Sequence, residues 1–188
     1  MRFMMLAVAA LAVALISCNG GQPRLYKVAI DPSPLNNLAT TCWNTGNVPV
    51  DTTTLTNGFL DYEWTIWDGA ADKQYLALTQ TTFALGNANP VRVCTGNADS
   101  LPCLIEGGAK SFSSSRVFTR NSVNPVETDT RTLTITFDDT PGETAKGTLN
   151  VKSLYACSGS CNKTSCEVTL PFVARRVDAQ ANTNYQGP

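Results

Sequence analysis

Phe59-Leu60-Asp61-Tyr62-Glu63-Trp64-Thr65-Ile66-Trp67-Asp68 is the most strongly patterned stretch of this chain of 188 residues. One set of alternate residues is large and apolar: Leu60, Tyr62, Trp64 and Ile66. The intervening set is mostly polar: Phe59, Asp61, Glu63, Thr65 and Trp67. Successive side chains of an extended chain point to opposite faces, so this pattern predicts a half-buried β-strand.

Segments on either side repeat the pattern. Residues 25–30 alternate and are followed by Pro32 and Pro34, which cannot donate to a sheet ladder and therefore end the strand. Residues 35–58 contain few large apolar groups and predict a loop with one short strand near Cys42. Further strands are predicted over residues 73–85, 131–137, 147–157 and 166–173, with turns at 68–72 and 138–143.

No window after the N-terminal segment shows apolar residues at helical spacing with caps. Short strands joined by Gly, Pro, Asn and Asp turns predict a single all-β domain over residues 25–177. The expected architecture is an antiparallel β-sandwich or a small closed β-barrel, stapled by disulfides. Residues 178–188 are polar and are predicted to form a C-terminal tail.

Charge and composition exclude several classes of function. The formal net charge is −1 and neither sign is clustered, which argues against a nucleic-acid partner. The chain contains no histidine, so it lacks the commonest general base, the commonest metal ligand and every Ser-His or Cys-His arrangement. We therefore expect no catalytic residue, no metal and no cofactor.

The N-terminal segment has the order of a secretory signal. Met1-Arg2 carries one positive charge, residues 3–16 are almost entirely apolar, and the small residue Ser17 precedes Cys18. The apolar run is shorter than the roughly 20 residues that a membrane-spanning helix needs. Residues 1–17 are therefore predicted to be a signal peptide.

Leu15-Ile16-Ser17-Cys18 resembles the bacterial lipoprotein signal, in which an aliphatic, a variable and a small residue precede a cysteine that is lipidated. The resemblance implies cleavage before Cys18, acylation of that cysteine, and a short lipidated tether over residues 18–24. Several acyl chains together hold a protein on a membrane essentially permanently. In this family an Asp after the cysteine favours the inner membrane, so Asn19 implies the cell envelope's outer membrane.

Six cysteines remain after Cys18, and an even number in an exported chain predicts disulfides. Cys94 and Cys103 bracket a turn-rich loop and form the first expected pair. Cys157 and Cys166 bracket another loop and are the second choice, which leaves Cys42 for Cys161 by default. Six cysteines permit fifteen pairings, which the sequence does not resolve. The spacing of the last three does not match zinc-binding Cys pairs.

Other groups have plain structural interpretations. Asp61 and Glu63 could form an acid/base pair, but a solvated strand face explains them equally well. Asp138, Asp139 and Glu143 could surround Ca²⁺, but they lack the spacing of an EF-hand and are interpreted as a turn. The serines 113–115 lack a nucleophile motif and indicate a loop or an edge strand.

The aromatic residues are the best candidates for a binding surface. Trp67 falls on the opposite face of its strand from Tyr62 and Trp64, so it either packs under a loop or lies partly exposed at a ligand or partner surface. Trp43 and Tyr75 belong to the same possible surface. In a closed barrel, aromatic residues could instead line an interior cavity, as in lipocalins.

Two classes of function follow. The first is an outer-membrane-anchored lipoprotein with a non-catalytic structural, adhesive or partner-binding domain, whose partner is an envelope protein or a glycan. The alternative is a lipocalin-like carrier of a small apolar ligand. A cavity of several hundred Å³ inside the barrel would favour the carrier, and a filled interior would argue against it.

Overall fold

A computed structural model describes residues 23–39, 42, 60–69, 72–83, 91–120, 126–159 and 165–177. The predicted signal peptide, the lipidation site Cys18, Trp43, Cys161 and the predicted tail 178–188 lie outside the described residues.

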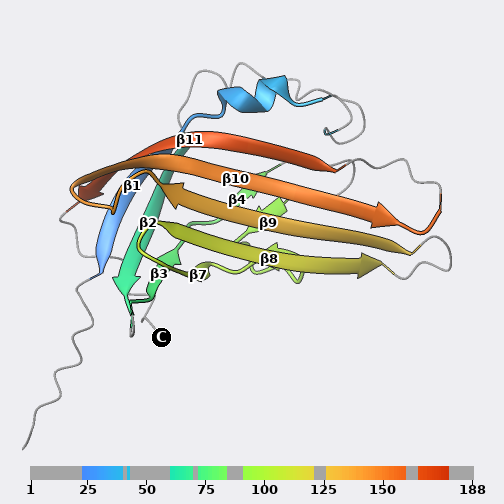
Figure 1. Cartoon of the computed structure of the whole chain (residues 1–188), viewed down its shortest axis with the longest axis horizontal. Coiled ribbons are helices and arrows are strands. Elements are labelled where there is room, and N and C mark those ends of the chain that lie inside the picture. The colour runs from blue at the N-terminus through green and yellow to red at the C-terminus, as the bar shows by residue number, and fades with distance from the viewer. Residues whose placement is uncertain are drawn as a thin grey trace, which may run out of the picture.

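The domain is an antiparallel β-barrel, which confirms the all-β prediction and selects the closed form. Eight strands close in the order β1-β11-β10-β9-β8-β7-β3-β2, and β4, β5 and β6 form a separate small sheet (Figure 1). The elements are β1 (Arg24–Ile30), the 3-10 helix η1 (Ser33–Asn37), β2 (Leu60–Asp68), β3 (Gln74–Ala77), β4 (Thr81–Phe83), β5 (Val91–Val93), β6 (Ser100–Leu101), β7 (Leu104–Gly107), β8 (Ser111–Arg120), β9 (Glu127–Phe137), β10 (Thr144–Cys157) and β11 (Cys166–Val177). No helix among the described residues is long and apolar enough to span a membrane.

Strands β8 to β11 are longer than the other barrel strands and lie side by side well beyond them (Figure 1). At one margin, β1 pairs only with residues 172–177 of β11. At the other margin, β7 pairs with β8 only through Gly107 and Phe112. The remainder of β8 to β11 is therefore an open extension of the barrel wall, which we call the extended sheet. Residues of the small sheet belong to the same apolar core as those of the extended sheet.

The inward faces of the strands are those that the alternating pattern predicted. Trp64 and Ile66 are buried, as are the apolar residues of the pattern in β9 and β11: Leu133, Ile135, Phe137, Val168, Leu170 and Phe172. Rings in the barrel meet edge to face, with centroids 5.0 Å apart for Trp64 and Phe172 and 5.3 Å apart for Phe137 and Phe172. Such contacts add to the hydrophobic stabilisation of the core.

The described side chains inside the barrel form one packed apolar cluster. A void bounded by Ile30, Trp64 and Leu149, among others, has a volume of only about 10 Å³. A single water needs about 10–15 Å³. The closed barrel is compatible with either predicted class, a structural or partner-binding domain or a carrier.

Two disulfides join described cysteines. Cys94 bonds to Cys103, as predicted, and Cys42 bonds to Cys166. The predicted pairs Cys157–Cys166 and Cys42–Cys161 are therefore wrong. Cys157 is also disulfide-bonded, and its partner lies outside the described residues.

The register of β10 and β11 explains why Cys157 does not bond to Cys166. Cys166 lies opposite Ser153, so Cys157 is four residues further along β10. Four strand residues extend about 13 Å, so Cys157 lies about that far along β10 from the position opposite Cys166. Disulfides require Cα atoms within about 7 Å. Cys157 and Cys166 bracket a loop in the sequence, but the sequence does not reveal where the strands of this hairpin begin to pair.

The segment from Asp31 to Cys42, which we call the strap, covers the margin of the extended sheet formed by β11. The amide of Asp31 donates to the carbonyl of Pro171 at 2.9 Å, η1 packs on β11, and the strap ends in the disulfide to Cys166. The carbonyl of Pro171 points toward the strap, and so does its nitrogen. The lack of an N–H on this proline therefore costs no hydrogen bond between β11 and β10. The strap therefore protects an otherwise open strand edge.

Tyr26 links β1 to the turn between β9 and β10. Its buried hydroxyl donates to the carbonyl of Gly142 at 3.0 Å. Burial raises the pKa of Tyr26 above its ordinary value, although the charges of Arg24 and Arg176 oppose this shift. The neutral phenol is thus favoured in the folded state.

We expect a specific loss of stability at alkaline pH from Tyr26. Because its pKa is higher in the folded state, its contribution is complete below the unfolded pKa of about 10 and is lost as pH rises through the folded pKa. Urea unfolding between pH 9 and 11 should therefore show a steeper decline for the wild type than for Tyr26→Phe. Parallel declines would contradict this assignment.

Candidate functional site: a groove on the outer barrel wall

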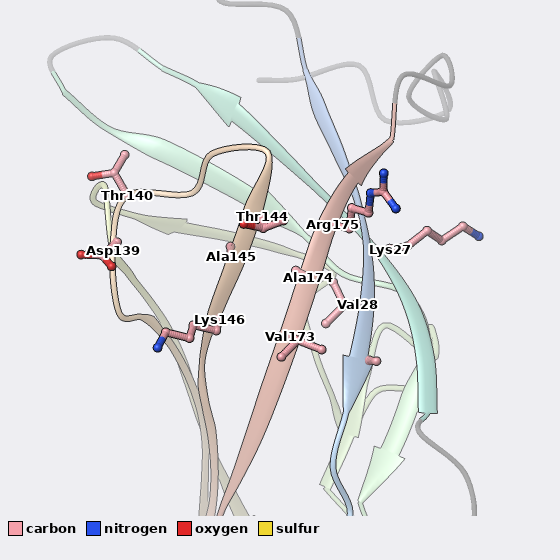
Figure 2. A pocket seen from close by; sticks show the side chains of 11 residues that line it. Lys27, Val28, Asp139, Thr140, Thr144, Ala145, Lys146, Val173, Ala174 and Arg175 are labelled. Carbon is pink, nitrogen blue, oxygen red and sulfur yellow. The ribbon is translucent and has the colours of Figure 1, made fainter.

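A groove with a volume of about 580 Å³ lies on the outer wall of the barrel, over β1, β10 and β11. Its centre is formed by Val173, which lies opposite Ala29 of β1 on one side and Lys146 of β10 on the other. The side chain of Ala29 is too small to fill the space beside Val173. Figure 2 shows Asp139 and Thr140 on the β9–β10 turn at one side of the groove and Lys27 at the other.

The rim of the groove carries three cations and one anion: Lys27, Lys146, Arg175 and Asp139. Lys27 forms an ion pair with Glu63. Lys146 and Asp139 have more distant partners, Asp138 and Lys110, each at 3.7 Å. Within the described residues, Arg175 forms no ion pair, so its guanidinium is the cation most available to a ligand.

The floor of the groove is apolar. Val173 exposes 56% of its surface in the groove. An apolar floor with a cationic rim suits a ligand that carries an anionic group beside an apolar segment.

The predicted aromatic surface is only partly described. Trp67 and Tyr75 lie directly opposite each other on β2 and β3, on the outer wall, and both are half-buried. Glu106 of β7 lies on the other side of Tyr75 and forms an ion pair with Lys73 at 2.6 Å, which raises the pKa of Lys73. Trp43 is outside the described residues. A binding role for these aromatic residues stays a prediction.

The structure gives the carboxylates structural partners. Glu63 is engaged with Lys27, and the side chain of Asp61 lies outside the described residues. The predicted turn carries Asp138, Asp139 and Glu143, which pair with Lys146, Lys110 and Arg176 at 3.7, 3.7 and 3.8 Å. Among the residues the structure describes, no three potential ligands form a metal-binding group.

The serines 113–115 form part of β8, so the edge-strand interpretation is the one the structure bears out. The hydroxyls of Ser113 and Ser115 are hydrogen-bonded to those of Thr134 and Thr132 across the strand pair, each at 2.9 Å. These contacts belong to a hydroxyl-rich outer face and do not resemble a nucleophilic site.

A buried charge cluster on the extended sheet was missed by the sequence analysis. Arg131 of β9 is only 1% exposed, and its Nε donates to Asp129 at 2.7 Å. Ser153 donates to the other oxygen of Asp129 at 2.8 Å, and the Arg131 guanidinium lies 4.4 Å from the ring centroid of Phe118. Arg131 also donates to the carbonyl of Asp99 at 3.2 Å, which ties the loop between β5 and β6 of the small sheet to β9.

A signal for this cluster was present in the sequence. The alternating pattern predicts an inward-facing set in this strand: Leu133, Ile135 and Phe137. Counting back from Leu133 in steps of two residues reaches Arg131 and Asp129. Both residues therefore had to face the core side, where charges are found only when paired. The cluster is a structural junction, since its members are fully engaged with one another.

Comparison with protein-family models finds no matching family, and comparisons with curated proteins and with solved structures find no match either. The function of this chain is therefore inferred from its own residues and geometry.

Proposed function

We propose that this protein is an envelope lipoprotein, anchored through acylated Cys18, whose β-barrel domain is non-catalytic and binds an envelope protein or glycan with its outer surface. The groove on the outer wall carries this proposal, because it combines an apolar floor with a cationic rim on the described surface of the barrel.

Two further observations support export and anchoring. The described cysteines form disulfides, which persist in oxidising compartments such as the periplasm. In addition, β1 begins at Arg24, six residues after Cys18. Six residues span at most about 20 Å, so a lipid on Cys18 would hold the Arg24 end of the barrel close to the membrane surface.

The proposal predicts that labelling with palmitate depends on Cys18. The wild-type protein should incorporate labelled palmitate in cells and partition into detergent, whereas Cys18→Ala should do neither. Asn19→Asp is the matched control, because it alters the residue associated with sorting but leaves the acylated cysteine intact. Equal labelling and partitioning of the wild type and Cys18→Ala would end the lipoprotein interpretation.

A further inference from the structure

The two margins of the extended sheet are treated differently. The β11 margin is covered by the strap, whereas β8 pairs with β9 on one side and, after Phe112, with no described strand on the other. Figure 1 shows β8 and β11 at opposite margins of this sheet. Among the described strands, β6 contacts β8 but does not pair with it. A strand edge without a pairing partner is a ready template for another strand.

The hydrogen-bond alternation identifies which residues of β8 face the open side. The amide of Phe137 donates to the carbonyl of Lys110 at 2.8 Å, and the register continues from this pair along β8 and β9 without interruption. Bonded and non-bonded pairs alternate in an antiparallel ladder. Residues with even numbers therefore bond to β9, and those with odd numbers direct their N–H and C=O groups away from it: Ser113, Ser115, Val117 and Thr119.

Exposed apolar side chains gather at the same end of the sheet. Val117 is 59% exposed and lies opposite Thr130, which in turn lies opposite Leu154, itself 48% exposed. Val126, immediately before β9, is 43% exposed. An incoming strand beside β8 would extend this outer face and cover part of its apolar surface.

Arg116 makes the edge selective for charge. Its side chain is on the inner face, where it donates to the carbonyl of Ser100 at 3.0 Å and lies 5.4 Å from the ring centroid of Phe118, yet the residue remains exposed. An acidic residue on an incoming strand beside β8 would form a favourable ion pair with Arg116. A second copy of β8, paired antiparallel about Arg116, would place two arginines opposite each other, which is unfavourable.

We propose that β8 accepts an extended strand from a partner protein, with backbone hydrogen bonds at residues 113–119, an acidic residue beside Arg116 and an apolar residue beside Val117. This inference rests on the proposed function for the partner's location in the envelope, and it narrows the partner class to a protein. The binding chemistry itself does not require the lipid anchor.

The test uses the purified full chain in detergent, isotopically labelled for NMR, and a short capped peptide that alternates valine with threonine and carries one central glutamate. At saturation, amide exchange should slow by about tenfold or more at Ser115, Val117 and Thr119. The amides of residues 116 and 118, already bonded to β9, should change little. The alternation distinguishes strand addition from adsorption on the apolar surface.

Val117→Pro removes an outward N–H without removing a bond to β9, and it should weaken peptide binding about tenfold, whereas Val117→Thr, which keeps this N–H, should bind the peptide more tightly than Val117→Pro. Arg116→Glu should weaken binding of the glutamate peptide and favour a lysine peptide, which keeps the test informative if the proline variant unfolds. Absent protection, protection only at the groove, or equal binding by all variants would overturn the proposal. Dimerisation that Val117→Pro abolishes would assign the edge to a second copy and also overturn it.

Failure of this inference is separable from failure of the proposed function. Loss of peptide binding with intact palmitate labelling would overturn the strand acceptor alone. Peptide binding by a chain that is not acylated would overturn the anchor and retain the strand acceptor.

Discussion

Replacing both Cys42 and Cys166 with serine is expected to lower the free energy of unfolding by about 4–5 kcal/mol. The disulfide between them closes a sequence separation of 124 residues, whereas that between Cys94 and Cys103 closes a separation of 9. Loop-closure entropy in the unfolded chain grows with the logarithm of loop length, so the matched Cys94→Ser/Cys103→Ser variant should lose only about 2–3 kcal/mol.

Urea unfolding of the two double variants under identical non-reducing conditions checks this difference. The Cys42→Ser/Cys166→Ser variant should also self-associate as concentration rises, because release of the strap uncovers the β11 edge. Two results would show that the strap does not depend on its disulfide. One is equal destabilisation of the two double variants. The other is a Cys42→Ser/Cys166→Ser variant that stays monomeric with an intact β11 edge.

Replacing Arg131 with methionine is expected to cost about 3–5 kcal/mol of stability. The substitution leaves the carboxylate of Asp129 buried with only the Ser153 hydroxyl described as a remaining donor. It also removes the contact with Phe118 and the hydrogen bond to the carbonyl of Asp99. Most of the cost is therefore the penalty of an unpaired buried charge and not the net value of the ion pair.

The double variant Arg131→Met/Asp129→Leu separates these two contributions. If the unpaired charge dominates, the second substitution should restore most of the lost stability, since an apolar pair of similar volume often replaces a buried ion pair without loss. A double variant less stable than Arg131→Met would contradict this account.

Much of the fold could be predicted because alternation directly reports a strand with one buried face. The pattern of β2 placed Trp64 and Ile66 inside, and those of β9 and β11 placed their apolar sets correctly. The short strands β5, β6 and β7 were not predicted, since segments of two to four residues are too short to show a period. The choice between sandwich and barrel depended on pairing between distant strands, which no local pattern encodes.

The candidate site could be predicted much less well. The groove depends on Ala29, Val173 and Lys146, which come from three strands and become neighbours only through the register. The edge of β8 that no described strand pairs with after Phe112 depends on contacts between distant segments, which local sequence does not encode. The burial of Arg131, by contrast, could have been predicted by extending the period of two back from Leu133.

The most direct test of the central claim is the intact mass of the protein extracted from cell envelopes with detergent. We predict a chain of residues 18–188 that carries acyl groups on Cys18 and gains no mass when alkylated without reduction, because the other six cysteines are oxidised. An unacylated chain with a different N-terminus, or one that retains residues 1–17, would contradict the account.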